Sequence, residues 1–180
     1  MVRFSLSAVG ADRPGIVAAL TGALVDAGCN LLDSTMAILQ GQFAVLLVVS
    51  APDTVSAQSI ETVLAPAARR FELMLAVRPL AGSVPDAADA AGREPWVLAI
   101  HGADRPGIVH AVTAALAEVG GNVVDLATHL VDRGDTPLYA MTVRATLPPG
   151  MAQSAAEHVR AAAARVGVRC SFHRDDADIL

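Results

Sequence analysis

The sequence predicts an α+β protein of two similar domains, each a four-stranded antiparallel sheet with two helices on one face. Three observations lead to this fold class. An eight-residue stretch occurs twice, letter for letter. Strand-like and helix-like hydrophobic patterns follow both copies in the same order. A segment rich in Pro, Gly and Ala separates the two halves.

The repeated stretch reads Gly-Ala-Asp-Arg-Pro-Gly-Ile-Val, at Gly10–Val17 and again at Gly102–Val109. We call these the first and the second octet. Their offset, 104 − 12 = 92 positions, is too long for a solenoid repeat and fits two small domains. The expected organisation is a first domain over 1–78, a linker over 79–95, a second domain over 96–174 and an acidic tail over 175–180.

In the first half, apolar residues alternate with polar ones from Val2 to Ala8, which is typical of a half-buried strand. Apolar residues at helical spacing predict a helix over Pro14–Ala27, with Gly28 in the left-handed position after its last turn. Pro66 is expected to kink the second helix or end it early. The other elements expected are strands Asn30–Leu39 and Phe43–Ser50, helix Val55–Arg70 and strand Phe71–Val77.

The second half repeats this order. Tyr139 matches Phe43 at an offset of 139 − 43 = 96, so the turn Val131–Pro137 has gained 96 − 92 = 4 residues. The β-α-β-β-α-β order is typical of the ferredoxin-like arrangement. The elements expected are strand Trp96–His101, helix Pro106–Val119, strands Asn122–Leu130 and Leu138–Thr146, helix Met151–Val166 and strand Val168–Arg174.

Composition excludes several classes of function. Apolar residues make up 53% of the 180 residues, which argues against disorder. The net charge is −5 and the 13 basic residues, all Arg, are scattered, so direct nucleic-acid binding is not expected. The longest apolar run, Phe43–Val49, is far short of the ~20 residues of a membrane span, and no signal peptide precedes it. We therefore expect a cytoplasmic protein that contacts no membrane.

The cysteines and histidines predict neither a metal site nor catalysis. Cys29 and Cys170 lie one in each half, which favours two small buried side chains over a disulfide or zinc site. His101 and His110 flank the second octet, but Val9 and Ala18 take their places in the first. No nucleophile, acid–base pair or phosphate-binding glycine motif is present. We expect no enzyme, no cofactor and no metal.

The octet itself allows two interpretations. A carboxylate at Asp12 can accept hydrogen bonds from free N–H groups near Gly15 and Ile16, which would simply cap the helix. Alternatively, Gly15 lets a small ligand approach, and the positive end of the helix dipole attracts an anion such as an α-carboxylate. The same alternatives hold for the second octet, with Asp104.

Asn30 and Asn122 follow a helix-ending glycine by two positions. We expect them to lie beside the octets. Their amides offer donors and an acceptor to the ammonium or carboxylate of a ligand. The alternative is that each asparagine closes the preceding turn in a left-handed conformation.

Asp-Arg-Pro-Gly-Ile after a short strand, followed about fifteen positions later by Gly-x-Asn and a hydrophobic residue, resembles the ACT domain. That family is a small regulatory module of ferredoxin-like fold that binds amino acids. The resemblance covers both halves and implies ligand sites at interfaces between units. The residues that would line them are Asp12, Arg13, Pro14, Gly15, Ile16 and Asn30, and Asp104, Arg105, Pro106, Gly107, Ile108 and Asn122.

Gly-Cys-Asn-x-x-Asp-Ser is complete only in the first half, because Gly121 stands in place of Cys29 and Leu126 in place of Ser34. The resemblance implies a regulator that binds a small amino acid, glycine or serine by analogy. It also implies a homo-oligomer that acts through a separate protein, as a repressor subgroup of the family does. A regulatory subunit of an amino-acid or one-carbon enzyme, and a structural dimerisation module without ligand, remain open as alternatives.

Overall fold

The computed structural model of the chain describes residues 1–80, 92–131 and 138–175. The chain divides into two compact units, Met1–Val84 and Pro85–Leu180. Each has its own cluster of buried apolar side chains. Within the described ranges, no helix has the length and apolar character needed to span a bilayer. The turn expected at Val131–Pro137 and most of the expected linker and tail lie outside the described residues.

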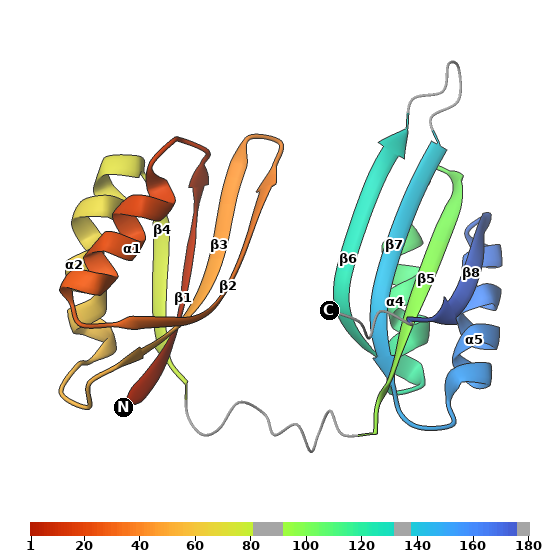
Figure 1. Cartoon of the computed structure of the whole chain (residues 1–180). Helices are drawn as coiled ribbons and strands as arrows, with labels where there is room; N and C mark the ends of the chain where they lie inside the picture. Colours follow the sequence, from red (N-terminus) through yellow and green to blue (C-terminus); the bar gives the residue numbers. More distant parts are fainter. Residues whose placement is uncertain (81–91, 132–137, 176–180) are drawn as a thin grey trace. The chain divides into compact units, whose positions relative to one another are not determined.

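The first unit follows the predicted order β-α-β-β-α-β (Figure 1). Its four strands form an antiparallel sheet in the order β2-β3-β1-β4, so β2 and β4 are the edge strands. This is the ferredoxin-like arrangement predicted from the sequence. The elements are β1 (Val2–Ala11), α1 (Ile16–Asp26), β2 (Asn30–Leu39), β3 (Gln42–Ala51), α2 (Ala57–Phe71) and β4 (Met74–Pro79).

The second unit repeats the topology, with strand order β6-β7-β5-β8. Two helices again pack together, α4 against α5 as α1 against α2. The predicted repeat of one structural unit is thus confirmed element by element. The elements are β5 (Glu94–Ala103), α4 (Ile108–Glu118), β6 (Asn122–Val131), β7 (Leu138–Leu147), α5 (Ala152–Arg165) and β8 (Val168–Arg174).

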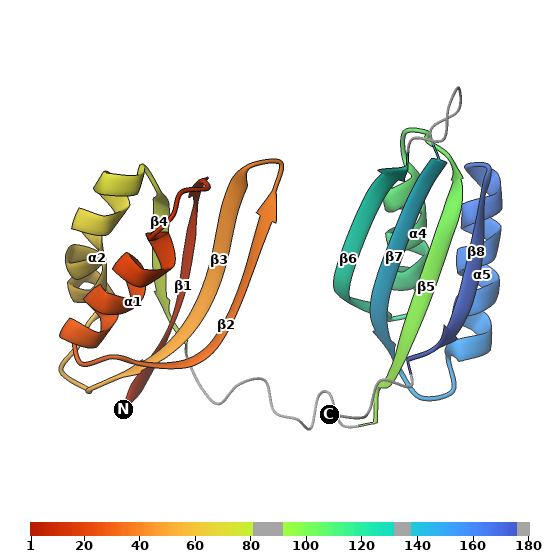
Figure 2. The same ribbon diagram turned by 45° about the horizontal axis from the view of Figure 1, so that its top comes forward.

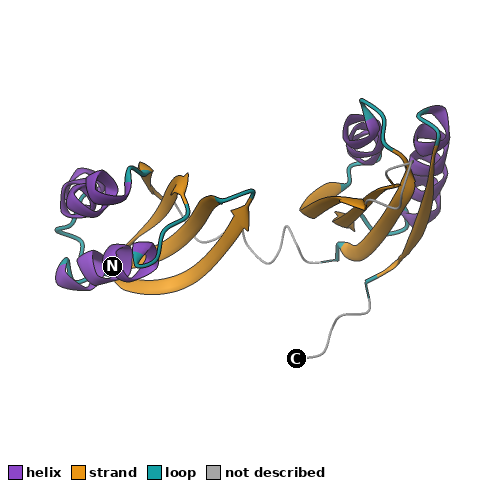
Figure 3. Ribbon diagram, turned by 90° about the horizontal axis from the view of Figure 1, so that it is seen from above, coloured by secondary structure: helices purple, strands orange, loops and turns teal. Residues whose placement is uncertain are grey.

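In each unit the helices cover one face of the sheet and leave the other open (Figure 3). The alternation in β1 explains this, because Phe4, Leu6 and Ala8 are buried toward the helices while Ser5 and Ser7 point to the open face. In the second unit, the helix α5 packs on the core with small side chains. In α5 the buried positions are almost all alanines, namely Ala155, Ala156, Ala162 and Ala163, with Val159 between them.

The structure corrects several sequence predictions of where elements begin and end, including the helix expected from Pro106, which begins at Ile108, and the strand expected from Trp96, which begins at Glu94. The first helix begins at Ile16 rather than Pro14, because Gly15 adopts a left-handed φ of 93° just before it. Phe71 ends α2 instead of opening the last strand, since its side chain is buried in the core on the helix side. The early end of the second helix that was one of the two effects expected of Pro66 does not occur, because α2 continues to Phe71.

Candidate functional site

The two octets have the same backbone conformation. Gly15 and Gly107, with φ of 93° and 91°, precede the first residues of α1 and α4. At neither helix start does a capping side chain accept a hydrogen bond from a backbone N–H. The interpretation that Asp12 caps the helix is therefore wrong for this structure, because the left-handed turn at Gly15 leads the chain into the helix without it. The first-turn N–H groups keep no side-chain acceptor.

The fold accounts for three residues of each octet. A Cβ built on Gly10 would lie 2.8 Å from Cδ2 of Leu73 and 3.2 Å from the carbonyl oxygen of Glu72, so this glycine allows the close approach of β1 to the start of β4. Gly15 supplies the positive φ, which costs other L-residues about 1–2 kcal/mol. Ile16 is 1% exposed and anchors α1 in the core. No close contact requires Gly15, since its Cβ would meet nothing nearer than Phe71 at 3.7 Å.

The Asp, Arg and Pro of each octet are exposed and lie outside the core. The Asp12 backbone N–H donates to the Gly41 carbonyl at 2.9 Å, which ties the first octet to the β2–β3 turn. Arg13 donates to Glu72 at 2.7 Å. The carboxylate of Asp12 accepts no hydrogen bond from the described residues. These exposed side chains can meet a group from outside the unit.

The structure separates each asparagine from the octet of its own unit. Asn30 pairs with Ser50, and Ser50 pairs with Arg3, at the end of the sheet where β1 begins. The octet lies at the other end, where Leu39 pairs with Gln42 and Gln42 with Ala11 (Figure 1). The 39 − 30 = 9 residue steps of β2 correspond to about 30 Å.

The expectation that the asparagines lie beside the octets is therefore wrong within one unit. The reason is that the helix before β2 returns the chain to the start of the sheet. The second unit has the same register, with Asn122 opposite Thr146 and Ala103 opposite Leu138 at the far end. Both asparagines are exposed, and neither amide has a hydrogen-bond partner among the described residues.

The strand β2 lies at the edge of the first sheet (Figure 2). Its residues are exposed along the whole strand. Met36 is 50% exposed, Ile38 55% and Leu39 72%. A bulge interrupts its pairing between Leu31 and Asp33, and the same bulge occurs in β6 between Val123 and Asp125. A long, apolar edge strand presents unpaired backbone groups and is a template for another strand.

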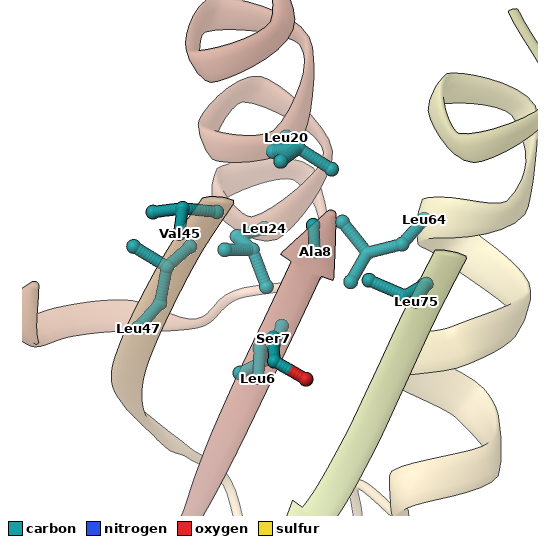
Figure 4. A pocket seen from close by; sticks show the side chains of 9 residues that line it. All are labelled: Leu6, Ser7, Ala8, Leu20, Leu24, Val45, Leu47, Leu64 and Leu75. Carbon is teal, nitrogen blue, oxygen red and sulfur yellow. The ribbon is translucent and has the colours of Figure 1, made fainter. Parts of the chain in front are cut away.

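The first unit contains a cavity of about 10 Å³ lined by nine residues of α1, α2 and three strands, including Leu20, Leu64 and Leu75 (Figure 4). This space holds about one water molecule. Even the smallest amino acid is too large for this cavity.

The two positions that the sequence singled out, Cys29 and Ser34, lie in different surroundings. Cys29 is buried in the first core, and burial raises the pKa of its thiol, so it acts as a small apolar side chain. At Gly121 a Cβ would lie 2.9 Å from the Leu116 carbonyl oxygen, so no thiol fits there. Ser34 is exposed on β2, and its backbone N–H donates to the Asp33 carboxylate.

The histidines of the second sheet occupy its surface. His101 and His129 both pair with Ala140 and therefore lie in one row on the open face, while His110 is exposed on α4. Among the described residues, no group of three His, Cys, Asp or Glu side chains could hold a metal ion. Tyr139, where the first unit has Phe43, has its pKa raised by burial and by the negative charge of Asp104.

Sequence reasoning missed Glu72 and its counterpart Gly167. Both have left-handed φ, 55° and 75°, in the connection that precedes the last strand of a unit. Aligning the two halves at an offset of 167 − 72 = 95 positions, instead of 92, would have matched Glu72 with Gly167.

A model described as "ACT domain" matches residues 3–78 and 94–135, which is more than half of the chain. The structure superposes on a protein of unknown function from Galdieria sulphuraria with a TM-score of 0.82 and 28% identity, covering 97% of this chain and 98% of that one. It also superposes on a candidate glycine cleavage system transcriptional repressor with a TM-score of 0.67 and 18% identity, covering 97% of each chain.

Two curated relatives, UPF0237 proteins from Methanosarcina mazei and Methanosarcina acetivorans, are 36% identical over 50 residues. The match covers 28% of this chain and 54% of each relative, so the chain spans about half the length of the curated relatives it matches.

Proposed function

Because the chain belongs to the ACT domain family, we propose that it is a non-catalytic regulatory protein that binds a small amino acid and acts through a partner protein. One observation carries this proposal. Asp, Arg and Pro occur in the same order in both octets, where neither the core nor a helix cap uses them. A free helix start with a guanidinium beside it suits an α-carboxylate.

The proposed site needs residues from two units. Within one unit, Asn30 and the first octet lie at opposite ends of the sheet. If β2 pairs antiparallel with β2 of a second copy of the chain, Asn30 of one copy lies beside Leu39 of the other. The Asp12–Gly41 hydrogen bond joins that end of β2 to the octet. The amide and the octet then flank one ligand, with the amide free for its ammonium or carboxylate.

Such pairing also covers an edge that is unfavourable to leave in water. The residues of β2 include no Lys, Arg or Pro and only one acidic residue, Asp33, so the devices that usually protect an edge strand are nearly absent. A two-fold axis makes the contact self-complementary, because the same strand supplies both sides. We therefore propose a homo-oligomer whose ligand sites lie across its interface.

A thermal-shift panel of the standard amino acids on the purified full chain tests the function. Binding raises apparent stability by mass action, by about 2.7 kcal/mol at a hundredfold excess over the dissociation constant. We expect a small amino acid, glycine or serine, to raise the melting temperature. If no amino acid at millimolar concentration does so, the proposed function is wrong.

Single substitutions then test the residues. Asn30→Ala and Asn122→Ala should each weaken binding, while Thr35→Ala, an exposed change on the same strand as Asn30, should not. Equal affinities for all three variants would show that the site lies elsewhere.

The assembly is tested by light scattering coupled to size exclusion. Met36→Lys should shift the protein toward a smaller species, because it places a charge on the exposed edge. Leu46→Lys is the matched control, since Leu46 is similarly exposed at 45% but belongs to the inner strand β3. A smaller species for both variants, or for neither, would contradict pairing through β2.

The partner decides between the two regulatory alternatives. A likeness of fold to a candidate transcriptional repressor favours a transcription regulator as the partner. Affinity purification of the tagged chain from its own cells, with and without the amino acid found in the panel, should recover a DNA-binding protein. Recovery of an enzyme of amino-acid or one-carbon metabolism would favour the regulatory-subunit alternative.

A further inference from the structure

The two octets face different residues at one equivalent position. Glu72 and Gly167 each have a left-handed φ and directly precede a buried residue, Leu73 or Val168. These buried residues are the ones that approach the first glycine of their octet. In both units their nearest atom lies 2.8 Å from the place that a Cβ on this glycine would take. Glu72 and Gly167 are therefore structural counterparts that flank the arginines of the octets.

The arginine of the first octet has a carboxylate partner. Nη2 of Arg13 donates to Oε2 of Glu72 at 2.7 Å. The side chains of Arg13 and Glu72 are 45% and 75% exposed, so the pair contributes little to stability. Part of the guanidinium's donor fork is used, and the net charge beside the helix start is cancelled.

The arginine of the second octet lies against bare backbone. A Cβ at Gly167 would be 2.6 Å from Nη1 of Arg105 and 3.2 Å from its Cζ. Within the described part of the chain, no carboxylate lies at ion-pair distance from Arg105. No described residue therefore occupies the guanidinium of Arg105 or neutralises its positive charge.

This difference has a chemical consequence for an anionic ligand. A guanidinium binds a carboxylate best with two parallel N–H donors. At the first octet a ligand carboxylate competes with the tethered Glu72 and is repelled by its charge. At the second octet, no carboxylate of the described residues competes with it in this way.

We propose that Glu72 and Gly167 set the affinity of the two octets, so that the second octet takes the carboxylate of the amino acid through Arg105 while Glu72 holds the first octet at low affinity. This inference rests on the proposed function. It assigns Glu72 as a positioning residue that lowers the affinity of the first octet through Arg13 rather than by touching the ligand.

The test is isothermal titration calorimetry of the full chain with glycine and with L-serine. Gly167→Glu places beside the second octet the glutamate that Glu72 provides beside the first. Gly167→Gln is the matched control, because its side chain has the same length and suffers the same strain at a left-handed φ but carries no charge. We expect Gly167→Glu to bind about two- to five-fold more weakly than Gly167→Gln, the range of an exposed ion pair. Glu72→Gln should tighten the weaker site of the wild type by a similar factor.

A further readout distinguishes charge from shape. The difference in ligand affinity between Gly167→Glu and Gly167→Gln should become smaller when the titration is repeated in high salt, because salt screens interactions between exposed charges. Glu72→Gln keeps the test decisive if the Gly167 variants fail to fold, since it alters an exposed side chain only.

The outcomes separate the two ideas. If the wild type binds neither glycine nor serine, the proposed function and this inference both fail. If the wild type binds one of them, but Glu72→Gln leaves both sites unchanged and Gly167→Glu equals Gly167→Gln, this inference fails and the proposed function stands.

Discussion

The two octets are identical in sequence and in backbone, yet their surroundings differ in charge and in packing. Around the first lie Phe43 and a carboxylate at Glu72; around the second lie Tyr139 and the bare backbone of Gly167. The two halves therefore share the residues that form the turn and differ in the residues around it. We therefore expect the two halves to differ more in what each octet binds than in how each unit folds.

The largest expected effect tests whether the units fold separately. Ile16→Ala and Ile108→Ala each remove a buried side chain, 1% and 2% exposed, and should destabilise by about 2–5 kcal/mol. Trp96 is the only Trp and lies in the second unit, stacked on Phe172. In urea, Ile108→Ala should lower the midpoint of the unfolding transition followed by tryptophan fluorescence. Ile16→Ala should leave that midpoint unchanged and shift only the part of the circular-dichroism transition that the first unit contributes.

Val17→Ala is the control for that comparison, because Val17 is 42% exposed and should cost much less. A fluorescence shift caused by Ile16→Ala would show that the stabilities of the two units are coupled.

The next effect concerns the first glycine of each octet. Gly10→Ala and Gly102→Ala push a Cβ into the neighbouring strand and should cost about 1–3 kcal/mol. Gly102→Ala should cost more, because Val168 offers a branched side chain at 2.8 Å and its Cα at 3.1 Å, whereas the flexible tip of Leu73 can move away from Gly10. Chemical denaturation measures both.

Gly22→Ala is the matched control, since a Cβ there meets nothing within 4 Å in the middle of α1. It should stabilise by about 0.4–1 kcal/mol by restricting the unfolded chain. Equal costs for Gly10→Ala and Gly102→Ala would show that both strands relax equally well.

A smaller effect separates binding from capping. Asp12→Ala and Asp104→Ala should change stability by no more than about 0.5 kcal/mol, because neither side chain caps its helix. Ser56→Ala should cost about 1 kcal/mol, because Ser56 and Ser59 form a capping box at the start of α2. Thermal denaturation of the three variants without ligand decides the point. A cost for Asp12→Ala as large as that for Ser56→Ala would restore the capping interpretation.

The smallest effect comes from Tyr139, which has no counterpart hydroxyl in the first unit. Burial, and then the charge of Asp104, raise the pKa of its phenol above the ordinary value near 10. Above that value the unfolded chain loses a proton that the folded chain keeps. The stability contributed by the neutral phenol is therefore lost as pH rises toward the folded pKa.

Tyr139→Phe should remove this loss, so the wild type should weaken relative to the variant above pH ~10. Tyr139 is the only Tyr, so ultraviolet absorbance follows its ionisation directly. Asp104→Asn should bring the pKa closer to its ordinary value. An unchanged titration curve would place the Asp104 carboxylate too far from the ring to matter.

Much of the fold was predictable because local chemistry fixes it. The structure contains the strand that the period of two predicts in β1 and the helix that the apolar spacing predicts after each octet. Gly28 has the left-handed φ that was expected of it. The bounds failed where tertiary packing decides them. Phe71 has strand-like chemistry, but the core beneath α2 accepts its ring from the helix side.

The candidate site was predictable only in part. The repetition singled out the octets, and their exposed Asp, Arg and Pro remain its proposed centre. The position of Asn30 was not predictable from its distance in sequence, because strand register places it about 30 Å from the octet of its own unit. Glu72 lacked any motif of its own, and only its contact with Arg13 reveals it.

The sequence by itself determined that one unit occurs twice, that each unit has the order β-α-β-β-α-β, and that an Asp-Arg-Pro-Gly turn opens the first helix of each. These are local properties, since hydrophobic period and turn chemistry act over a few residues. Only the tertiary structure decided which side chains meet across the sheet. It leaves the edge of β2 exposed and gives Arg13 a carboxylate partner that Arg105 does not have among the described residues, because strand pairing brings together residues that lie far apart in the chain.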